Sequence, residues 1–89
     1  MSTRRTVLKW LPVMTFDMPA GHVVITVETQ GDVPCMWTLG PDCAEPSTRR
    51  EFVAFGTGHP IDDEDLVYVG TAHDIAGALV FHIFERPPL

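Results

Sequence analysis

A short glycine-rich segment contains the residues best suited to chemistry. In Gly56-Thr57-Gly58-His59-Pro60, a hydroxyl and an imidazole lie among two glycines and a proline, with strand-like runs on both sides. Closely spaced glycines permit positive φ angles and can turn backbone N–H groups toward an anion. His59 precedes a proline, so its backbone is held extended and its side chain is aimed. We expect Thr57, Gly58 and His59 to contact a ligand. A tight turn that needs glycine only for its conformation would look the same.

The same region matches no catalytic or metal-binding motif. Its glycines lack the lysine and the spacing of a phosphate-binding P-loop. Thr57 and His59 could serve as nucleophile and base, but no third residue to orient the histidine can be named. The acidic run 62–65 lacks the alternating ligands of a calcium loop, and Cys35 and Cys43 lack histidines at zinc spacing. We therefore expect no catalysis, metal or cofactor, and a buried, free Cys35.

The charge of the chain favours a small ligand over a nucleic acid. The net charge is −6, whereas binding to a DNA or RNA polymer requires a basic surface. A small anion could still be held by one of the two adjacent arginine pairs. Neighbouring strand residues face opposite sides, so only one arginine of the pair at 49–50 can face a given side. Arg50 would share its face with Phe52, whereas Arg49 would share its face with Glu51, which could neutralise it. We expect Arg50 to supply the charge.

The rest of the chain reads as strands separated by turns. Extended segments are predicted at residues 6–11, 14–18, 22–30, 33–39, 49–55, 66–71 and 78–84. The single helical candidate is one turn near residues 62–66, which Asp62 could cap. We expect an all-β, mainly antiparallel fold of six or seven strands in one domain, residues 1–89, with an ordered core over about 6–85. A single sheet, a sandwich and a partly open barrel all fit this pattern.

The segment around Gly31-Asp32 predicts a hairpin with a fixed register. The expected partners are Gln30–Val33, Glu28–Cys35, Thr26–Trp37 and Val24–Leu39 on one face, and Val27–Met36 and Ile25–Thr38 on the other. Val23 and Ile25 are expected to point the same way as Val27. Both faces carry large apolar side chains, whereas a sheet with one wet face alternates more cleanly. A second layer is therefore expected, and the hydrophobic content of 45% favours self-association.

The aromatic residues and the remaining histidines have more than one interpretation. Trp10, Trp37 and Tyr68 could stack on a base or ring, although aromatic residues on strands often belong to the core. His82 alternates with apolar residues and fits a hydrogen-bonded histidine of a core or an interface. His22 and His73 lie at strand ends, where we expect both to be exposed.

Five blocks of sequence carry a resemblance to a known family. They are residues 33–39, 50–52, 56–62, 66–71 and 77–85, and their order and spacing agree with the pattern VPCxW…GTGHPID…GALVFHxFE. The chain resembles, over roughly residues 7–85, a family of short domains of unknown function found largely in phages and prophages. The resemblance assigns no binding or catalytic residue. It implies a small stand-alone accessory protein of phage type, made inside a bacterial cell.

These observations lead to one functional expectation and two alternatives. We expect a phage-type binding protein that sequesters a small nucleotide-derived immune signal in a pocket between subunits, without catalysis. Its expected ligand contacts are Arg50, Thr57, Gly58, His59 and Trp37. No apolar run reaches the roughly 18 residues needed to span a membrane, and the N-terminus is a poor signal peptide, so we expect the host cytoplasm. The alternatives are a structural or protein-interaction module, which could inhibit a host protein, and a small hydrolase that uses His59.

Overall fold

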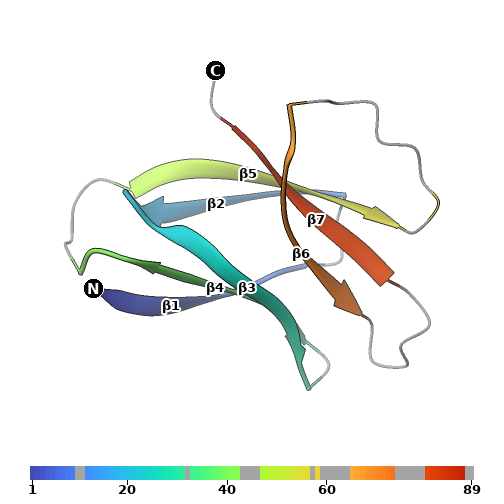
Figure 1. Ribbon diagram of the computed structural model, residues 1–89, viewed down its shortest axis with the longest axis horizontal. Helices are drawn as coiled ribbons and strands as arrows, with labels where there is room; N and C mark the ends of the chain where they lie inside the picture. Colours follow the sequence, from blue (N-terminus) through green and yellow to red (C-terminus); the bar gives the residue numbers. More distant parts are fainter. Residues whose placement is uncertain are drawn as a thin grey trace.

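Two antiparallel β-sheets make up the computed structural model, which describes residues 1–9, 12–31, 33–42, 47–56, 58, 65–73 and 80–87 (Figure 1). In these residues the strands are β1 (Ser2–Val7), β2 (Val13–Pro19), β3 (Val23–Gln30), β4 (Val33–Gly40), β5 (Ser47–Gly56), β6 (Val67–His73) and β7 (Val80–Arg86). One sheet has the order β1-β4-β3 and the other the order β2-β5-β7-β6. The predicted all-β, antiparallel fold is confirmed.

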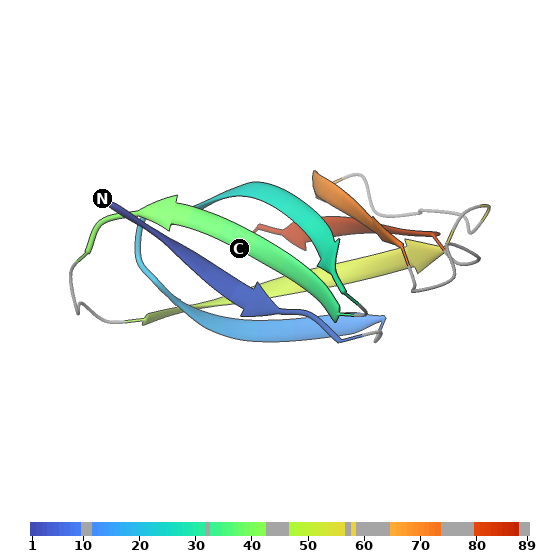
Figure 2. The same ribbon diagram turned by 90° about the horizontal axis from the view of Figure 1, so that it is seen from below.

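The hydrophobic core lies between the two sheets, which form separate layers in Figure 2. Val27 and Met36 of the three-stranded sheet lie in one buried cluster with Phe52 and Ile83 of the four-stranded sheet. The cluster is completed by Leu8, Met14, Met18 and Ala72. The second layer predicted from the hairpin is therefore present on the Val27–Met36 face. Alternation along a strand turns the other face of the hairpin, which carries Trp37, away from this core.

The hairpin register is confirmed over its first half and wrong beyond it. Gln30 lies opposite Val33 as predicted, and the pairing holds as far as Thr26 opposite Trp37. A β-bulge between Val24 and Thr26 then shifts the register, so that Val24 lies opposite Thr38 and not Leu39. The bulge also corrects the predicted facing of β3: Val24 packs against the core, whereas Val23 and Ile25 are 57% and 51% exposed.

The bulge occurs where β3 crosses β6 and the two sheets meet. A second bulge interrupts β6 between Tyr68 and Gly70. A Cβ atom on Gly70 would lie 2.6 Å from Cβ of Val27, so glycine is the residue that admits the crossing strand. Nearby, the Thr29 hydroxyl donates to the carbonyl of His73 at 2.6 Å and accepts from its N–H at 3.3 Å. A side chain thus stands in for main-chain pairing, and the bulges bend both strands at the junction.

The first strand differs most from its predicted position. It was expected at residues 6–11 but spans Ser2–Val7. Arg4 and Arg5, interpreted from the sequence as a basic pair, are exposed residues of this edge strand. Charged side chains are a common means of protecting a sheet edge from unwanted pairing. Trp10, residues 57 and 59–64 and Cys43 lie outside the described residues. No helix among those described is long and apolar enough to cross a membrane.

Candidate functional site

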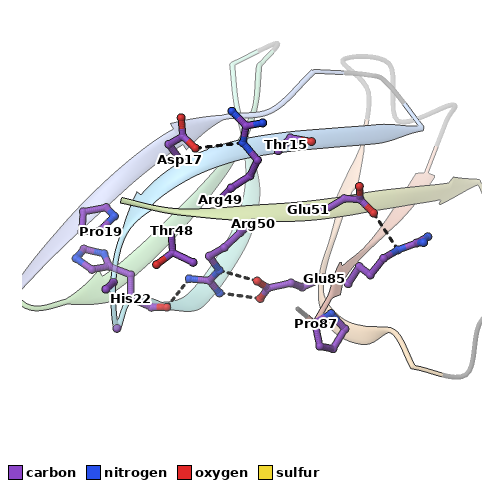
Figure 3. A pocket seen from close by; sticks show the side chains of 13 residues that line it. Thr15, Asp17, Pro19, His22, Thr48, Arg49, Arg50, Glu51, Glu85 and Pro87 are labelled. Atoms are coloured by element: carbon purple, nitrogen blue, oxygen red, sulfur yellow. Dashed lines mark hydrogen bonds and ion pairs between the residues drawn. The ribbon is translucent and has the colours of Figure 1, made fainter. Parts of the chain in front are cut away.

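A surface cavity of about 830 Å³ opens beside the first half of β5. It lies where the β2–β3 turn approaches the end of β7, and its volume is within the usual range for ligand sites, about 300–1,000 Å³. Its charged lining residues are Asp17, Arg49, Arg50, Glu51, Glu85 and Arg86 (Figure 3). The three arginines are balanced by three carboxylates. The cavity therefore has no excess of positive charge for an anion.

Arg50 is held firmly inside this cavity. Its Nε and Nη2 atoms donate to the two carboxylate oxygens of Glu85 at 2.5 and 2.7 Å, and Nη1 donates to the carbonyl of His22 at 2.5 Å. The two side chains are only 16% and 17% exposed. The hydrogen bonds that Arg50 donates to Glu85 raise the pKa of Arg50 above its ordinary value. As predicted, Arg50 shares its face with Phe52, whose ring centroid lies 5.8 Å from the guanidinium carbon.

The remaining charges of the cavity form two more cross-strand pairs. Arg49 lies opposite Asp17, with 3.5 Å between its Nε and the carboxylate, and Glu51 accepts from Arg86 at 2.9 Å. Glu51 thus neutralises Arg86, whereas the sequence had suggested Arg49 as its partner. Both adjacent arginines are paired with a carboxylate, Arg49 with Asp17 at the exposed surface and Arg50 with Glu85 in a largely buried position.

His22 lies next to Arg50 and is buried, which corrects the expectation that it would be exposed. Only 5% of it is accessible. Its Nε2 lies 3.1 Å from the carbonyl of Pro41, and its Nδ1 lies 3.1 Å from the Thr38 hydroxyl. Because a carbonyl can only accept, Nε2 carries a proton and donates to Pro41. A Cβ on Gly40 would lie 2.3 Å from Cδ2 of the ring, so the absence of a side chain there makes room for the imidazole.

Arg50, Trp37 and Gly58, the expected ligand residues that the structure describes, do not lie together in one copy of the chain. Arg50 lines the cavity, and Trp37 lies half-buried on β4 in the other sheet. Gly58 follows the far end of β5, which advances about 3.3 Å per residue, so that its last residue, Gly56, lies about 20 Å from Arg50 along the strand. Gly58 is exposed and has a φ angle of 90°, as the glycine argument expected. Thr57 and His59 lie outside the described residues.

A second candidate site lies at that far end, on the outer face of the four-stranded sheet. We call it the aromatic patch, and it consists of Phe55, Tyr68, Thr71, His82 and Phe84. The register places Phe55, His82 and Thr71 in one row and Phe84 and Tyr68 in the next. Phe84 meets Phe55 and Tyr68 edge to face, with centroids 5.8 and 5.5 Å apart. Tyr68 is 57% exposed, so its ring is available to a further partner.

A chain of hydrogen bonds runs through the aromatic patch. The Tyr68 hydroxyl lies 2.6 Å from the Thr71 hydroxyl, which lies 3.1 Å from Nδ1 of His82. When His82 is neutral with its proton on Nε2, Thr71 donates to Nδ1 and accepts from Tyr68. The oxygen of the Tyr68 hydroxyl then still has acceptor capacity. The expectation that His82 is hydrogen-bonded is confirmed, and His73 is exposed as expected.

Sequence reasoning missed several of these residues for a physical reason. Tyr68 was recognised as a stacking candidate, but Thr71 was not, because its importance comes from lying opposite His82. Glu85 was missed because it reaches Arg50 across two strands distant in the sequence. The order β2-β5-β7-β6 places β7 beside β5 and so creates the contact of Arg50 with Glu85, which no local turn encodes. Thr71 and His82 lie on the consecutive strands β6 and β7, whose register the sequence did not fix. The sequence signal for the aromatic patch was the alternation along β7, where His82 and Phe84 flank Ile83, which is buried.

No group of three or more potential ligands for a metal ion occurs in the described parts of the chain.

Comparison with known proteins places the chain in a family. No curated protein and no solved structure matches the chain. A family described as a domain of unknown function, DUF7352, matches residues 3–89. The match covers nearly the whole sequence, and the chain therefore belongs to the DUF7352 family.

Proposed function

We propose that this protein is a non-catalytic binding protein for a small ligand that contains a planar ring. The observation that carries the proposal is the exposed Tyr68 ring, supported by Phe84 and placed beside the Thr71–His82 pair. Stacking of a base on an aromatic side chain contributes about 1–3 kcal/mol. The Tyr68 hydroxyl, which is hydrogen-bonded to Thr71, lies on the same surface and can accept a hydrogen bond from a polar group of the ligand.

The surroundings of the aromatic patch suit a ligand that also carries an anionic group. Gly56, the last residue of β5, lies opposite Phe81 and thus adjoins the row of Phe55 and His82. The strand β5 therefore ends beside the patch, and Gly58 has the positive φ that an anion-binding loop requires. A ring and an adjacent anion are the two parts of a nucleotide. Thr57 and His59 remain predicted contacts of the anion.

We further propose that the biological role is sequestration. The resemblance to domains carried by phages and prophages supports a viral accessory protein that acts in the cytoplasm of a bacterial host. In that setting the ligand is a nucleotide-derived immune signal, which the protein holds without chemical change. Arg50 and Trp37 lie away from the aromatic patch in one copy. They take part in binding only if pockets form between subunits, as the sequence suggested.

Native mass spectrometry tests this proposal directly. The purified protein is measured before and after incubation with a small-molecule extract from bacteria whose defences are activated. We expect a gain of a few hundred daltons per site, lost in Tyr68→Ala and retained in part by Tyr68→Phe, which keeps the ring. Val13→Ala, an equally exposed position of the same sheet, is the matched control. A protein that stays bare in every extract, or an adduct that Tyr68→Ala does not affect, contradicts the proposal.

A protein-interaction role is the second candidate, and a different observation favours it. The outer face of the three-stranded sheet exposes several apolar side chains, among them Val7, Val23 and Val33. Exposed apolar surface of this kind is typical of interfaces. This face is separate from the aromatic patch, so the two roles can coexist in one molecule.

A further inference from the structure

We propose that His82, acting through Thr71, decides whether the Tyr68 hydroxyl accepts a hydrogen bond from a ligand or donates one to it. Protonation of His82 reverses the preference. The inference rests on the proposed binding of a ring at the aromatic patch and concerns the regulation of that same site. It starts from two contacts: the hydroxyl oxygens of Tyr68 and Thr71 are 2.6 Å apart, and the Thr71 oxygen lies 3.1 Å from Nδ1 of His82.

The middle position of Thr71 allows only two arrangements of these hydrogen bonds. A threonine hydroxyl has a single proton, so it can donate to only one of its two neighbours. If Thr71 donates to His82, it must accept from Tyr68. If it donates to Tyr68, it must accept from His82. Both hydrogen bonds therefore run in the same direction, either from Tyr68 toward His82 or from His82 toward Tyr68.

The proton on Nδ1 of His82 selects between the two directions. In the neutral imidazole with its proton on Nε2, Nδ1 accepts, and the Tyr68 proton is used by Thr71. The Tyr68 oxygen then offers a ligand only acceptor capacity. In the imidazolium both ring nitrogens donate, so Thr71 donates to Tyr68, which turns its own proton outward. Histidine ordinarily changes charge between about pH 5 and 8, and mild acid is thus expected to reverse the direction.

The position of His82 in the sheet keeps it apart from the ion pairs of the described residues. The ionisable residues that share the outer face of the four-stranded sheet with His82 are Asp17 on β2, Arg49 and Glu51 on β5, Tyr68 and His73 on β6, and Arg86 on β7. The charged ones form two ion pairs, of which Glu51–Arg86 is the nearer, about 13 Å from His82 along the strand. Phe81 and Ile83, on either side of His82, pack toward the other sheet. Among the described residues His73, opposite Val80, is the other histidine of this face and calls for a control.

The two directions favour different chemical groups on the ligand. A ring that stacks on Tyr68 brings the groups at its periphery close to the hydroxyl at the edge of the tyrosine ring. When Tyr68 offers only acceptor capacity, it matches an N–H or amino group. When its proton points outward, it matches a carbonyl, a ring nitrogen or another acceptor. A ligand group of the wrong kind leaves its hydrogen bond unmade, which weakens binding.

Two small rings of opposite hydrogen-bonding character test the inference. Indole has an N–H donor as its only polar group, whereas quinoline N-oxide has only an acceptor oxygen. Neither gains or loses a proton in mild acid, and neither carries a phosphate, which would itself titrate at about pH 6. Binding of each probe to the full chain is measured by NMR titration at about pH 7.5 and about pH 5.5, on either side of the usual histidine range. On acidification we expect the affinity for indole to fall about fivefold and that for quinoline N-oxide to rise by a similar factor.

Four variants show whether the effect passes through Thr71. Thr71→Val keeps the branched shape but removes the hydroxyl, and is expected to bind both probes with affinities that hardly depend on pH. Thr71→Ser keeps the hydroxyl and should restore the dependence. Tyr68→Phe keeps the ring and should still bind both probes, again without the dependence. His73→Gln removes the neighbouring imidazole and should leave the reversal intact.

The outcomes separate this inference from the proposal on which it rests. The charge of His82 is followed in the same samples through the NMR signals of its ring nitrogens. Opposite shifts of the two affinities that accompany protonation of His82 and vanish in Thr71→Val support the inference. Affinities that do not change with pH, a change that Thr71→Val retains, or a His82 that stays neutral at the lower pH overturn it and leave ring binding standing. A native protein that binds neither probe at either pH contradicts ring binding, and the inference with it.

Discussion

At the scale of single residues, Arg50 acts as a clamp between the sheets. It lies in the four-stranded sheet, where it donates twice to Glu85 of β7, and it also donates to the carbonyl of His22, which leads into β3 of the other sheet. Most of this guanidinium is removed from water, and three of its five N–H donors are used. The arrangement favours a structural role for the residue that the sequence suggested as the ligand's counter-ion.

Replacement of Arg50 by alanine is expected to destabilise the protein by about 2 kcal/mol. Glu85 would keep its charge in a largely buried position without a partner, and the hydrogen bond to the other sheet would be lost. Arg49→Ala is the control, because its pair with Asp17 is long and exposed and should contribute less than about 0.5 kcal/mol. Urea unfolding of both variants measures the difference. Equal unfolding midpoints for the two variants would show that Arg50 does not hold the sheets together. Arg50 would then again be a candidate for contact with the ligand.

The face of β5 on which Arg50 lies was predictable from the sequence, but the carboxylate that pairs with Arg50 was not. Alternation along a strand placed Arg50 with Phe52, and the structure agrees. Glu85 could not be found in this way, because it lies on a strand whose position next to β5 follows from the packing of the whole sheet. Alternation shows which residues share a face of one strand, whereas strand order decides which charges meet.

At the scale of elements, the crossing of β3 over β6 is the point that the fold depends on most closely. Both strands carry a bulge there, and Gly70 and Val27 are in contact range. Turn and alternation signals located the hairpin and its register as far as Thr26. They could not show the bulge, because the bend that it introduces is needed only when β6 lies against β3. The sequence marked this place only by the isolated glycine within a strand pattern.

Substitution of Gly70 by alanine is expected to destabilise the protein by at least about 2 kcal/mol. The new methyl group would lie 2.6 Å from Cβ of Val27, a branch point that cannot move without its backbone. Val67→Ala, on the same strand but 54% exposed, should cost far less. Thermal unfolding followed by circular dichroism compares the two variants. If Gly70→Ala melts like the native protein, the sheets are not in close contact at this crossing.

The ends of β1 and β4 give a dependence on pH. Hydrogen bonds from Ser2 and from the amino group of Met1 lower the pKa of Asp42 from its ordinary value of 3.8. A carboxylate with a lowered folded pKa contributes stability above its unfolded pKa and loses it as the pH falls through the folded value. We expect Asp42→Asn to be slightly less stable than the native protein at pH 7, with the difference gone in strong acid. A difference that persists in acid would show that charge is not its origin.

At the scale of the whole molecule, the two sheets share one small core. The molecule is flattened, with extents of 38 × 32 × 17 Å, so few side chains are far from the surface. The buried cluster draws on Val27 and Met36 from one sheet and on Phe52 and Ile83 from the other. Neither sheet can keep its inner face covered alone. A domain of this kind should unfold in a single step, since loss of one layer exposes the core of the other.

A substitution in one sheet should therefore lower the unfolding midpoint of both sheets by the same amount. Ile83→Val removes one methylene from a side chain that is 2% exposed and is expected to cost about 0.5–1.5 kcal/mol. Amide signals of β4 and of β7, followed by two-dimensional NMR through a urea titration, should disappear at a common midpoint. In the variant both sets should shift to lower urea by the same amount, because the transition involves both layers. A shift confined to β7 would mean that the three-stranded sheet holds together without its partner layer. The titration uses dilute protein, so that a common midpoint reflects the sandwich of a single chain.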